Sequence, residues 1–175
     1  NRVVVGMGES PVRGVMTSSG DGVYKSLDAG ETWEHIGLEN TKHISQVRIH
    51  PKDPDIMYVA AQGSPYASTQ ERGVYMTTDG GENWEKVLYV NGFSGVSDLA
   101  MDYNNPRVLY AAFWDHQRLP WYVRSGGNGS GIWKTVDGGK TWNKLEDGLP
   151  NALMGKIGVA AVSYTHLRAH ETGWY

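Results

Sequence analysis

The sequence predicts an all-β protein, a partial β-propeller of four-stranded antiparallel blades cut from a larger ring. Two observations lead to this prediction. A short motif that ends in tryptophan occurs three times, about fifty residues apart, and each copy follows an alternating apolar and polar run typical of a strand. Between the copies, two further strand-like runs flank a proline-containing turn, so that each period holds four strands.

The repeated motif has the composition of a tight turn between two strands. Its three copies are 26–33, 77–84 and 135–142. In each copy an aspartate can accept hydrogen bonds from backbone N–H groups just ahead of it, and the last glycine can adopt positive φ without steric penalty. A tryptophan then starts the next strand and needs a surface to pack against. The residues expected to be structural are Asp28, Gly30, Trp33, Asp79, Gly81, Trp84, Asp137, Gly139 and Trp142.

The pattern Ser/Thr-x-Asp-x-Gly-x-Thr-Trp resembles the Asp-box, or bacterial neuraminidase repeat. This repeat occurs in sialidases, in xyloglucan-cleaving glycoside hydrolases and in sortilin-like receptor domains, and the resemblance extends over residues 2–161. Two positions depart from it: Ala29 replaces a glycine and Asn83 replaces a threonine. The resemblance implies a propeller fold and an extracytoplasmic or secreted location, and it leaves the activity open.

The chain follows the four-strand period in order. A strand at 2–6 and the first motif hairpin account for the last three strands of one blade. Two full blades follow, and residues 158–161 start a fourth. We therefore expect a propeller fragment over 1–161 whose partners include the missing blades of a parent chain. The strands expected before the motif turns of the two full blades are 44–49, 56–60, 73–76, 96–101, 107–112 and 131–134.

Residues 162–175 break the repeat, because no proline turn follows where one is due. The segment 163–172 resembles an in-frame translation of a transposase adapter used for sequencing libraries, so we interpret 162–175 as a non-native tail. His166 and His170 stand four residues apart, a spacing that would otherwise suggest a metal site. With the tail excluded, no metal site is predicted.

The composition excludes several classes of function. The 175-residue chain has a formal net charge of −3, which argues against nucleic-acid or membrane-surface binding that rests on bulk charge. It has no cysteine, and therefore neither a disulfide framework nor a thiolate metal site. No apolar run is long enough for insertion into a membrane. We expect no cofactor.

Strand alternation assigns the loops to two faces. The motif turns and the proline turns share one face, and the loops after the second strand of each blade, 8–21, 61–72 and 113–130, share the other. These three loops differ in length, whereas the spacing on the motif face is nearly constant. Variable loops on a regular scaffold are where binding sites are usually built.

The third of these loops carries the candidate ligand-binding residues. Three aromatic rings could form a platform for a sugar or a peptide, with charged neighbours as polar contacts; alternatively, the rings pack the loop onto its own scaffold. An acid–base pair of neighbouring Asp and His is less favoured, because no nucleophile partner is visible. The segment 128–130 matches a glycosylation sequon and also suits a turn. The candidates are Trp114, Asp115, His116, Arg118, Trp121 and Tyr122.

Two classes of function fit these observations. The first is a non-catalytic propeller that binds a protein, a peptide or a polysaccharide, as the resemblance to sortilin-like domains implies. The alternative is part of a glycoside hydrolase resembling the xyloglucan-cleaving or sialidase-type propellers. A hydrolase of that kind needs two carboxyls that flank the scissile bond. Glu9, Glu71 and Asp98 lie at or near the variable face, but their spacing cannot be read from sequence, so no catalytic residue is assigned.

Overall fold

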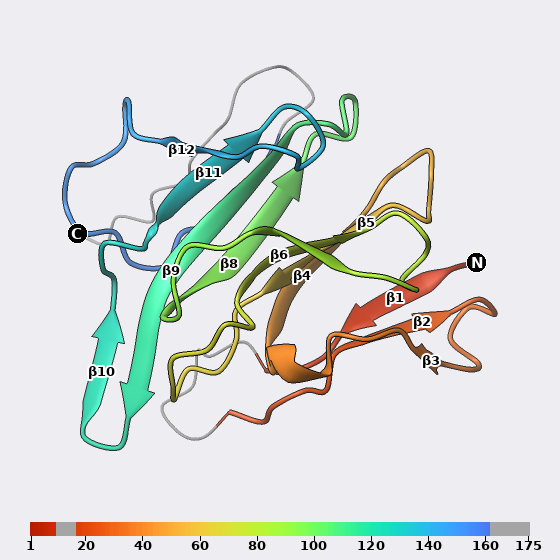
Figure 1. The fold of residues 1–175 in the computed structure, drawn as a ribbon, viewed down its shortest axis with the longest axis horizontal. Coiled ribbons are helices and arrows are strands. Elements are labelled where there is room, and N and C mark those ends of the chain that lie inside the picture. The colour runs from red at the N-terminus through yellow and green to blue at the C-terminus, as the bar shows by residue number, and fades with distance from the viewer. Residues whose placement is uncertain (10–16, 162–175) are drawn as a thin grey trace.

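The computed structural model describes residues 1–9 and 17–161, which form three antiparallel sheets (Figure 1). The first sheet consists of β1 (Val3–Gly6), β2 (Val23–Ser26) and β3 (Glu34–His35). After a short 3-10 helix, η1 (Glu39–Thr41), the second consists of β4 (Ile44–Ile49), β5 (Met57–Ala61), β6 (Gly73–Thr77) and β7 (Glu85–Leu88). The third consists of β8 (Ser94–Met101), β9 (Leu109–Leu119), β10 (Tyr122–Ser125), β11 (Gly131–Thr135) and β12 (Asn143–Leu145).

In the first two sheets the order of strands follows the order of the chain, and in the third β10 pairs only with β9. In the second sheet β4, β5, β6 and β7 are neighbours in sequence and in space, and every pairing is antiparallel. The third sheet repeats this arrangement with β8, β9, β11 and β12. The predicted all-β fold of four-stranded antiparallel units is therefore confirmed.

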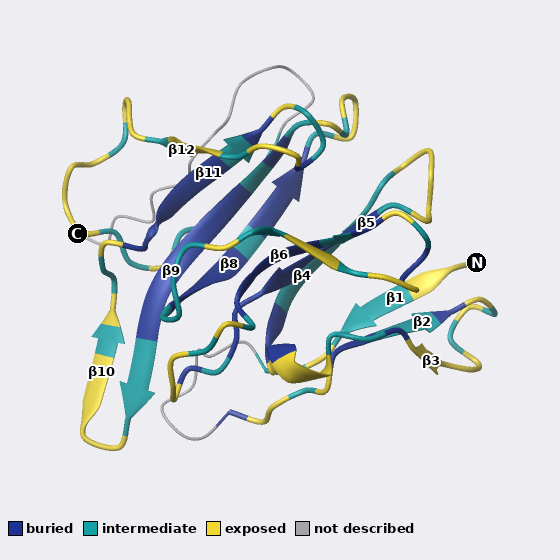
Figure 2. Cartoon of the chain, in the orientation of Figure 1, coloured by how far each residue is buried: buried dark blue, intermediate teal, exposed yellow. Residues whose placement is uncertain are grey.

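Apolar side chains fill the two layers between the sheets, and the inner strands are the most deeply buried part of the chain (Figure 2). Met57 and Val59 belong to the layer between the first and second sheets, whereas Tyr58 packs with Leu99 and Phe113 between the second and third. Successive residues of a strand point to opposite faces. β5 therefore contributes to both layers, which explains its continuous burial.

Each motif copy forms a turn, called here a box turn, in which the aspartate carboxylate accepts hydrogen bonds from other residues of the same turn. In the second box turn the Thr77 hydroxyl donates to Asp79 Oδ1 at 2.7 Å and accepts from the Gly81 N–H at 3.0 Å. Asn83 donates its backbone N–H to Asp79 Oδ1 at 3.0 Å and its side-chain amide to Oδ2 at 2.8 Å. The other two box turns repeat these bonds through Ser26, Asp28, Gly30 and Thr32, and through Thr135, Asp137, Gly139 and Thr141.

The two departures from the motif have different consequences. Asn83 supplies through its amide the donor that a threonine hydroxyl supplies in the other box turns, so the bond to the aspartate is kept. Ala29 adopts φ 67°, close to the φ of 74° and 77° at Gly80 and Gly138. The left-handed region is unfavourable for a residue with a Cβ. The first box turn is therefore strained at Ala29.

The box turns contact the proline turns, as the predicted arrangement of loops requires. Gly80 donates its N–H to the Asp55 carbonyl, and Gly138 donates its N–H to the Arg107 carbonyl, both at 2.9 Å. Because this contact recurs in both complete sheets, the two kinds of turn lie on one face of the molecule.

The structure differs from the sequence-based expectation in the third sheet. Most of 113–130 was expected to be loop, but β9 continues to Leu119 and turns back as β10. Leu119 pairs with Tyr122 and His116 with Ser125, so the two strands form a hairpin that projects beyond the sheet (Figure 1). The reason is that backbone pairing with β8 and then with β10 satisfies the main-chain groups along this stretch.

The segment 158–161, expected to begin another blade, has no strand assignment. Side chains of β8 hold it instead: Ser97 Oγ donates to the Ile157 carbonyl at 3.0 Å, and Asp98 Oδ2 accepts from the Val159 N–H at 2.9 Å. These bonds use side chains, so they do not build a ladder. The proposed tail 162–175 lies outside the described residues. In the part of the chain that the structure describes, no helix has the length and apolarity that a membrane crossing requires.

Candidate functional site

The described parts of the three variable loops lie together, as predicted. The Thr17 N–H donates to the Tyr66 hydroxyl at 2.9 Å, which joins the first loop to the second. The Arg118 N–H donates to the Pro65 carbonyl at 2.8 Å, which joins the second loop to the β9–β10 hairpin. We call this surface the variable-loop face.

A buried arginine shapes the middle loop. Arg72 is 1% exposed, and its guanidinium donates to the carbonyls of Gln62, at 2.9 Å, and of Ser64 and Ala67. Burial lowers the pKa of Arg72 to about 10, a value at which the side chain stays charged at neutral pH. A cation that binds several carbonyls fixes the path of the loop, because each carbonyl is a strong acceptor that must be satisfied.

The base of the hairpin is locked by charged and aromatic contacts. Arg124 on β10 forms an ion pair with Asp115 on β9 at 2.8 Å, and its guanidinium lies over the Phe93 ring at 4.7 Å. The Trp114 ring stacks on the His116 ring with centroids 4.0 Å apart and an interplanar angle of 22°. Because the ion pair joins β9 to β10 and the cation–π contact ties β10 to Phe93, the hairpin is a braced projection of the sheet.

The predicted site residues fall into two groups. Trp114, Asp115 and His116 are buried at the hairpin base, with exposures of 6%, 8% and 3%. Trp121 is 81% exposed and Tyr122 48% exposed at the hairpin tip. The expectation that three rings form one platform is therefore corrected. Trp114 is covered because His116 stacks on it, Ser125 accepts its indole N–H at 3.1 Å, and the Lys156 ammonium lies 5.7 Å from its centroid.

The remaining polar candidates have local partners. The His116 ring Nδ1 lies 3.0 Å from the Arg124 carbonyl, and burial lowers the pKa of His116 below its ordinary value. Arg118 is half-buried beside the exposed tip. Glu9 accepts from the Ser18 N–H at 3.1 Å, and Glu71 accepts from the Tyr75 hydroxyl at 3.2 Å. Within residues 1–9 and 17–161, no cluster of His, Asp and Glu side chains could hold a metal ion.

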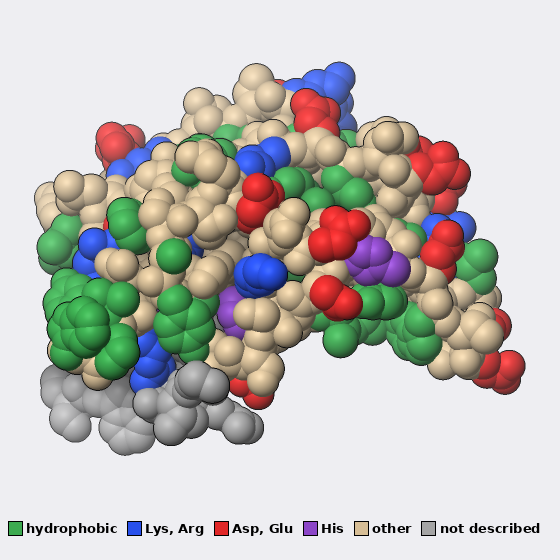
Figure 3. Space-filling model, turned by 60° about the horizontal axis from the view of Figure 1, so that its bottom comes forward, with side chains coloured by type: hydrophobic (Ala, Val, Ile, Leu, Met, Phe, Trp, Pro, Cys, Tyr) green, Lys and Arg blue, Asp and Glu red, His purple; other side chains and the backbone are tan. Residues whose placement is uncertain are grey.

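Hydrophobic side chains gather at one end of the molecule in Figure 3, the end that carries the β9–β10 hairpin, while acidic and basic side chains alternate over the middle of the view. The hairpin contributes three exposed apolar residues, Trp121, Tyr122 and Val123. An exposed indole beside a phenol offers flat apolar surface together with hydrogen-bonding groups. Such a tip is suited to contact with a sugar ring or a partner's side chain.

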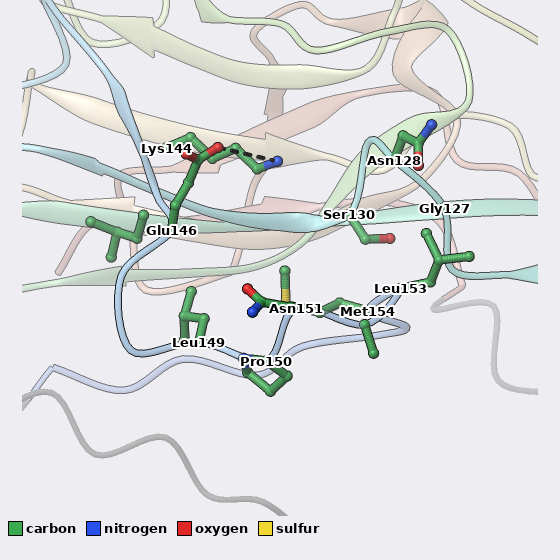
Figure 4. Close-up of a pocket in the computed structure, with 12 residues that line it drawn as sticks. Gly127, Asn128, Ser130, Lys144, Glu146, Leu149, Pro150, Asn151, Leu153 and Met154 are labelled. Atoms are coloured by element: carbon green, nitrogen blue, oxygen red, sulfur yellow. Dashed lines mark ion pairs between the residues drawn. The ribbon is translucent and has the colours of Figure 1, made fainter.

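Sequence reasoning missed a pocket of about 470 Å³ beside the hairpin base (Figure 4). The 127–130 turn, the end of β12 and the segment 149–154 form its walls. These three segments are separated in sequence, so only the packed fold brings them together. The lining residues are Gly127, Asn128, Ser130, Lys144, Leu145, Glu146, Leu149, Pro150, Asn151, Ala152, Leu153 and Met154.

With a propeller-type fold and a loop face established, comparison with known proteins gives the family. The family model Sortilin-Vps10, described as "Sortilin, neurotensin receptor 3", matches residues 21–156. The chain belongs to this family.

Curated relatives are xyloglucanases. The chain is 28% identical over 144 residues to Xyloglucanase Xgh74A of Acetivibrio thermocellus, a match that covers 74% of this chain and 15% of the relative. It is 26% identical over 138 residues to a xyloglucanase of a Paenibacillus species, covering 71% of this chain and 12% of the relative. The chain thus spans less than a fifth of the length of these relatives.

Solved structures of GH74 enzymes share the fold. An ancestral GH74 enzyme aligns with a TM-score of 0.56 at 16% identity, over 82% of this chain and 18% of the other. The GH74 enzyme of Niastella koreensis aligns with a TM-score of 0.54 at 21% identity, over 71% and 18%. The GH74 xyloglucanase of Xanthomonas campestris aligns with a TM-score of 0.53 at 18% identity, over 80% and 22%.

Proposed function

We propose that this chain is part of a propeller-type glycoside hydrolase and that its variable-loop face contacts a neutral polysaccharide such as xyloglucan. Two named xyloglucanases among its relatives favour this hypothesis over a purely non-catalytic binding role. A polymeric substrate of this kind is met outside the cytoplasm, so we also propose an extracytoplasmic location. No catalytic residue is assigned to this chain.

The observation that carries the proposal is the exposure of Trp121 on a braced hairpin. A hairpin whose backbone is already paired and braced loses little conformational freedom when a ligand binds at its tip. The apolar C–H face of a sugar ring fits the flat indole, and Tyr122 next to it extends the surface. Arg118, on the strand that leads to the tip, can orient hydroxyl groups through its several N–H donors.

Protein or peptide binding is the second candidate, and the match to the Sortilin-Vps10 family favours it. The same exposed tip suits a protein partner, because Trp, Tyr and Arg are the residues that dominate protein interfaces. A competition experiment distinguishes the two candidates. A soluble xyloglucan oligosaccharide competes for a site that binds polysaccharide and does not compete for a site that binds only protein. The two candidates can therefore be separated with one variant.

The test compares xyloglucan binding by the 175-residue chain and its Trp121→Ala variant, using isothermal titration calorimetry. We expect affinity to fall by about tenfold, which corresponds to the loss of one stacked ring. Trp33→Ala is the matched control, because Trp33 is also exposed, at 44%, but lies in a box turn on the opposite face. Equal affinity for the Trp121→Ala variant and the unsubstituted chain would refute the proposal, and binding of peptides alone would favour the second candidate.

A further inference from the structure

We propose that the pocket beside the hairpin base binds one neutral sugar unit of the polysaccharide. This inference rests on the proposed function and adds to it a ligand site of defined chemistry. The pocket opens between the 127–130 turn and the 149–154 segment, with Ser130, Asn151 and Met154 among the residues around it (Figure 4). Its volume of about 470 Å³ lies within the usual range for small-molecule sites.

The walls of the pocket are preformed by close backbone contacts. A Cβ on Gly126 would lie 2.8 Å from the Met154 carbonyl oxygen, and a Cβ on Gly127 would lie 2.6 Å from Asp115 Oδ2. Ser130 donates its N–H to the Gly127 carbonyl at 2.9 Å, and its buried hydroxyl accepts from the Asp115 N–H at 3.0 Å. The pocket is thus anchored to the same Asp115 that pairs with Arg124 in the hairpin.

The charge of the lining selects a neutral ligand. Lys144 and Glu146 are the charged residues among those that line the pocket, and they pair with each other at 4.0 Å (Figure 4). The Lys144 ammonium also lies 5.7 Å from the Trp133 ring centroid. With its two charges of opposite sign paired, the pocket offers no net charge to an anion or a cation.

The remaining polar groups match hydroxyls. Asn128 and Asn151 are exposed, and each amide has both a donor and an acceptor. No hydrogen bond between described residues occupies either side chain. Leu149, Pro150 and Met154 supply apolar surface for C–H groups. A lining of amides with apolar walls fits a ring that bears several hydroxyls, whereas an apolar ligand would leave these amides without partners.

The position of the pocket connects it with the exposed hairpin tip. Gly126 and Gly127 directly follow β10, whose first residue, Tyr122, flanks the tip. Four strand residues span about 10–13 Å. An extended chain that stacks on Trp121 can therefore place another of its sugar units in the pocket.

The experiment titrates the ¹⁵N-labelled chain with three probes, glucose, glucuronate and a xyloglucan oligosaccharide, and follows amide chemical shifts by NMR. We expect glucose and the oligosaccharide to shift signals from 127–130, 144–146 and 149–154. Replacing both amides, in Asn128→Ala with Asn151→Ala, should weaken glucose binding by about 10- to 30-fold, as expected for two hydrogen bonds. The matched control is Asn40→Ala, at an exposed asparagine within η1 in the first part of the chain.

The outcomes separate this inference from the proposed function. If Trp121→Ala weakens oligosaccharide binding while the double asparagine variant leaves the affinities for glucose and the oligosaccharide unchanged, the pocket proposal is wrong and the hairpin role stands. If only the double variant has an effect, the pocket stands and the hairpin role fails. Tighter binding of glucuronate than of glucose would overturn the neutral-ligand assignment. Because both asparagines are exposed, unchanged dispersion of the remaining signals verifies the fold of the variants.

Discussion

The hydroxyl of Tyr58 on β5 donates a hydrogen bond of 2.9 Å to the carbonyl of Gly138 in the third box turn, 80 residues along the chain. The ring is buried between the second and third sheets, and burial, with the nearby charge of Asp137, raises the pKa of Tyr58. The first and second sheets are joined in a similar way, since Lys25 Nζ donates to the Gly80 carbonyl at 3.0 Å. The second and third box turns therefore each accept a bond from the preceding sheet.

Tyr58→Phe should lower the free energy of unfolding by about 1 kcal/mol, because the variant loses one buried hydrogen bond and keeps the packed ring. Urea unfolding followed by tryptophan fluorescence measures the change. Tyr103→Phe is the control. Because Tyr103 is 58% exposed, this variant should unfold at the same urea concentration as the unsubstituted chain. Identical unfolding midpoints for Tyr58→Phe and the unsubstituted chain would contradict a stabilising role for this bond.

Ala29→Gly should raise the free energy of unfolding by about 0.5–1 kcal/mol. The gain from relieving a left-handed alanine is partly offset by the greater freedom of glycine in the unfolded chain. The reciprocal change, Gly80→Ala, should destabilise the equivalent position of the second box turn, where a Cβ would also lie 3.1 Å from Asp55 Oδ1. Differential scanning calorimetry measures the Tm of both variants. Tm shifts of the same sign would refute the strain at Ala29.

The box-turn aspartates should make the protein sensitive to acid. The Asn83 N–H, followed by the Thr77 hydroxyl and the Asn83 amide, holds the pKa of Asp79 well below its ordinary value. A depressed folded-state pKa adds stability that is complete above the unfolded pKa of about 4 and is lost as the pH falls toward the folded value. We expect Asp79→Asn to be less stable than the unsubstituted chain at pH 7 and to lose less stability between pH 4 and pH 2.

Urea unfolding midpoints at pH 7, 4 and 2.5 measure how steeply the stability of each protein depends on pH. Glu82→Gln is the control, because Glu82 lies exposed in the same box turn and accepts no hydrogen bond from it among the described residues. A pH profile of Asp79→Asn parallel to that of the unsubstituted chain would contradict the assignment.

Two buried histidines should make the folded state less stable as the pH decreases below neutral. Burial lowers the pKa of both His43 and His116, and Arg72 opposes protonation of each. Arg118 also opposes protonation of His116, whereas the Arg124 carbonyl and Asp115 favour it. Because the folded pKa is depressed, the stability contribution is complete above the unfolded value of about 6.5 and declines as the pH falls below it.

His116→Phe, which keeps a ring against Trp114, should therefore reduce the dependence of Tm on pH between 7.5 and 5. The contribution of His43 to the pH dependence remains in this variant, so the slope of Tm against pH should decrease without reaching zero. Thermal unfolding followed by circular dichroism is the measurement. A slope equal to that of the unsubstituted chain would show that His116 does not remain neutral in the folded protein.

The sequence alone determined the repeat and the chemistry of each box turn. These features are local: Asp79, Thr77 and Asn83 lie within seven residues of one another, and the glycines of the turn can adopt positive φ without steric penalty. The alternation of strands then placed the box turns opposite the variable loops, because each strand reverses the direction of the chain.

Only the tertiary structure decided which residues of the variable-loop face are accessible. Trp114 and Trp121 have the same chemistry and lie seven positions apart, yet one is covered and the other projects into solvent. The difference arises from Lys156 and Ser125, which pack on Trp114, and from the pairing of β9 with β10, which carries Trp121 outward. Likewise, the pocket exists because Gly126 and Gly127 allow distant segments to touch. Burial depends on which segment covers a side chain, and that information is not local in sequence.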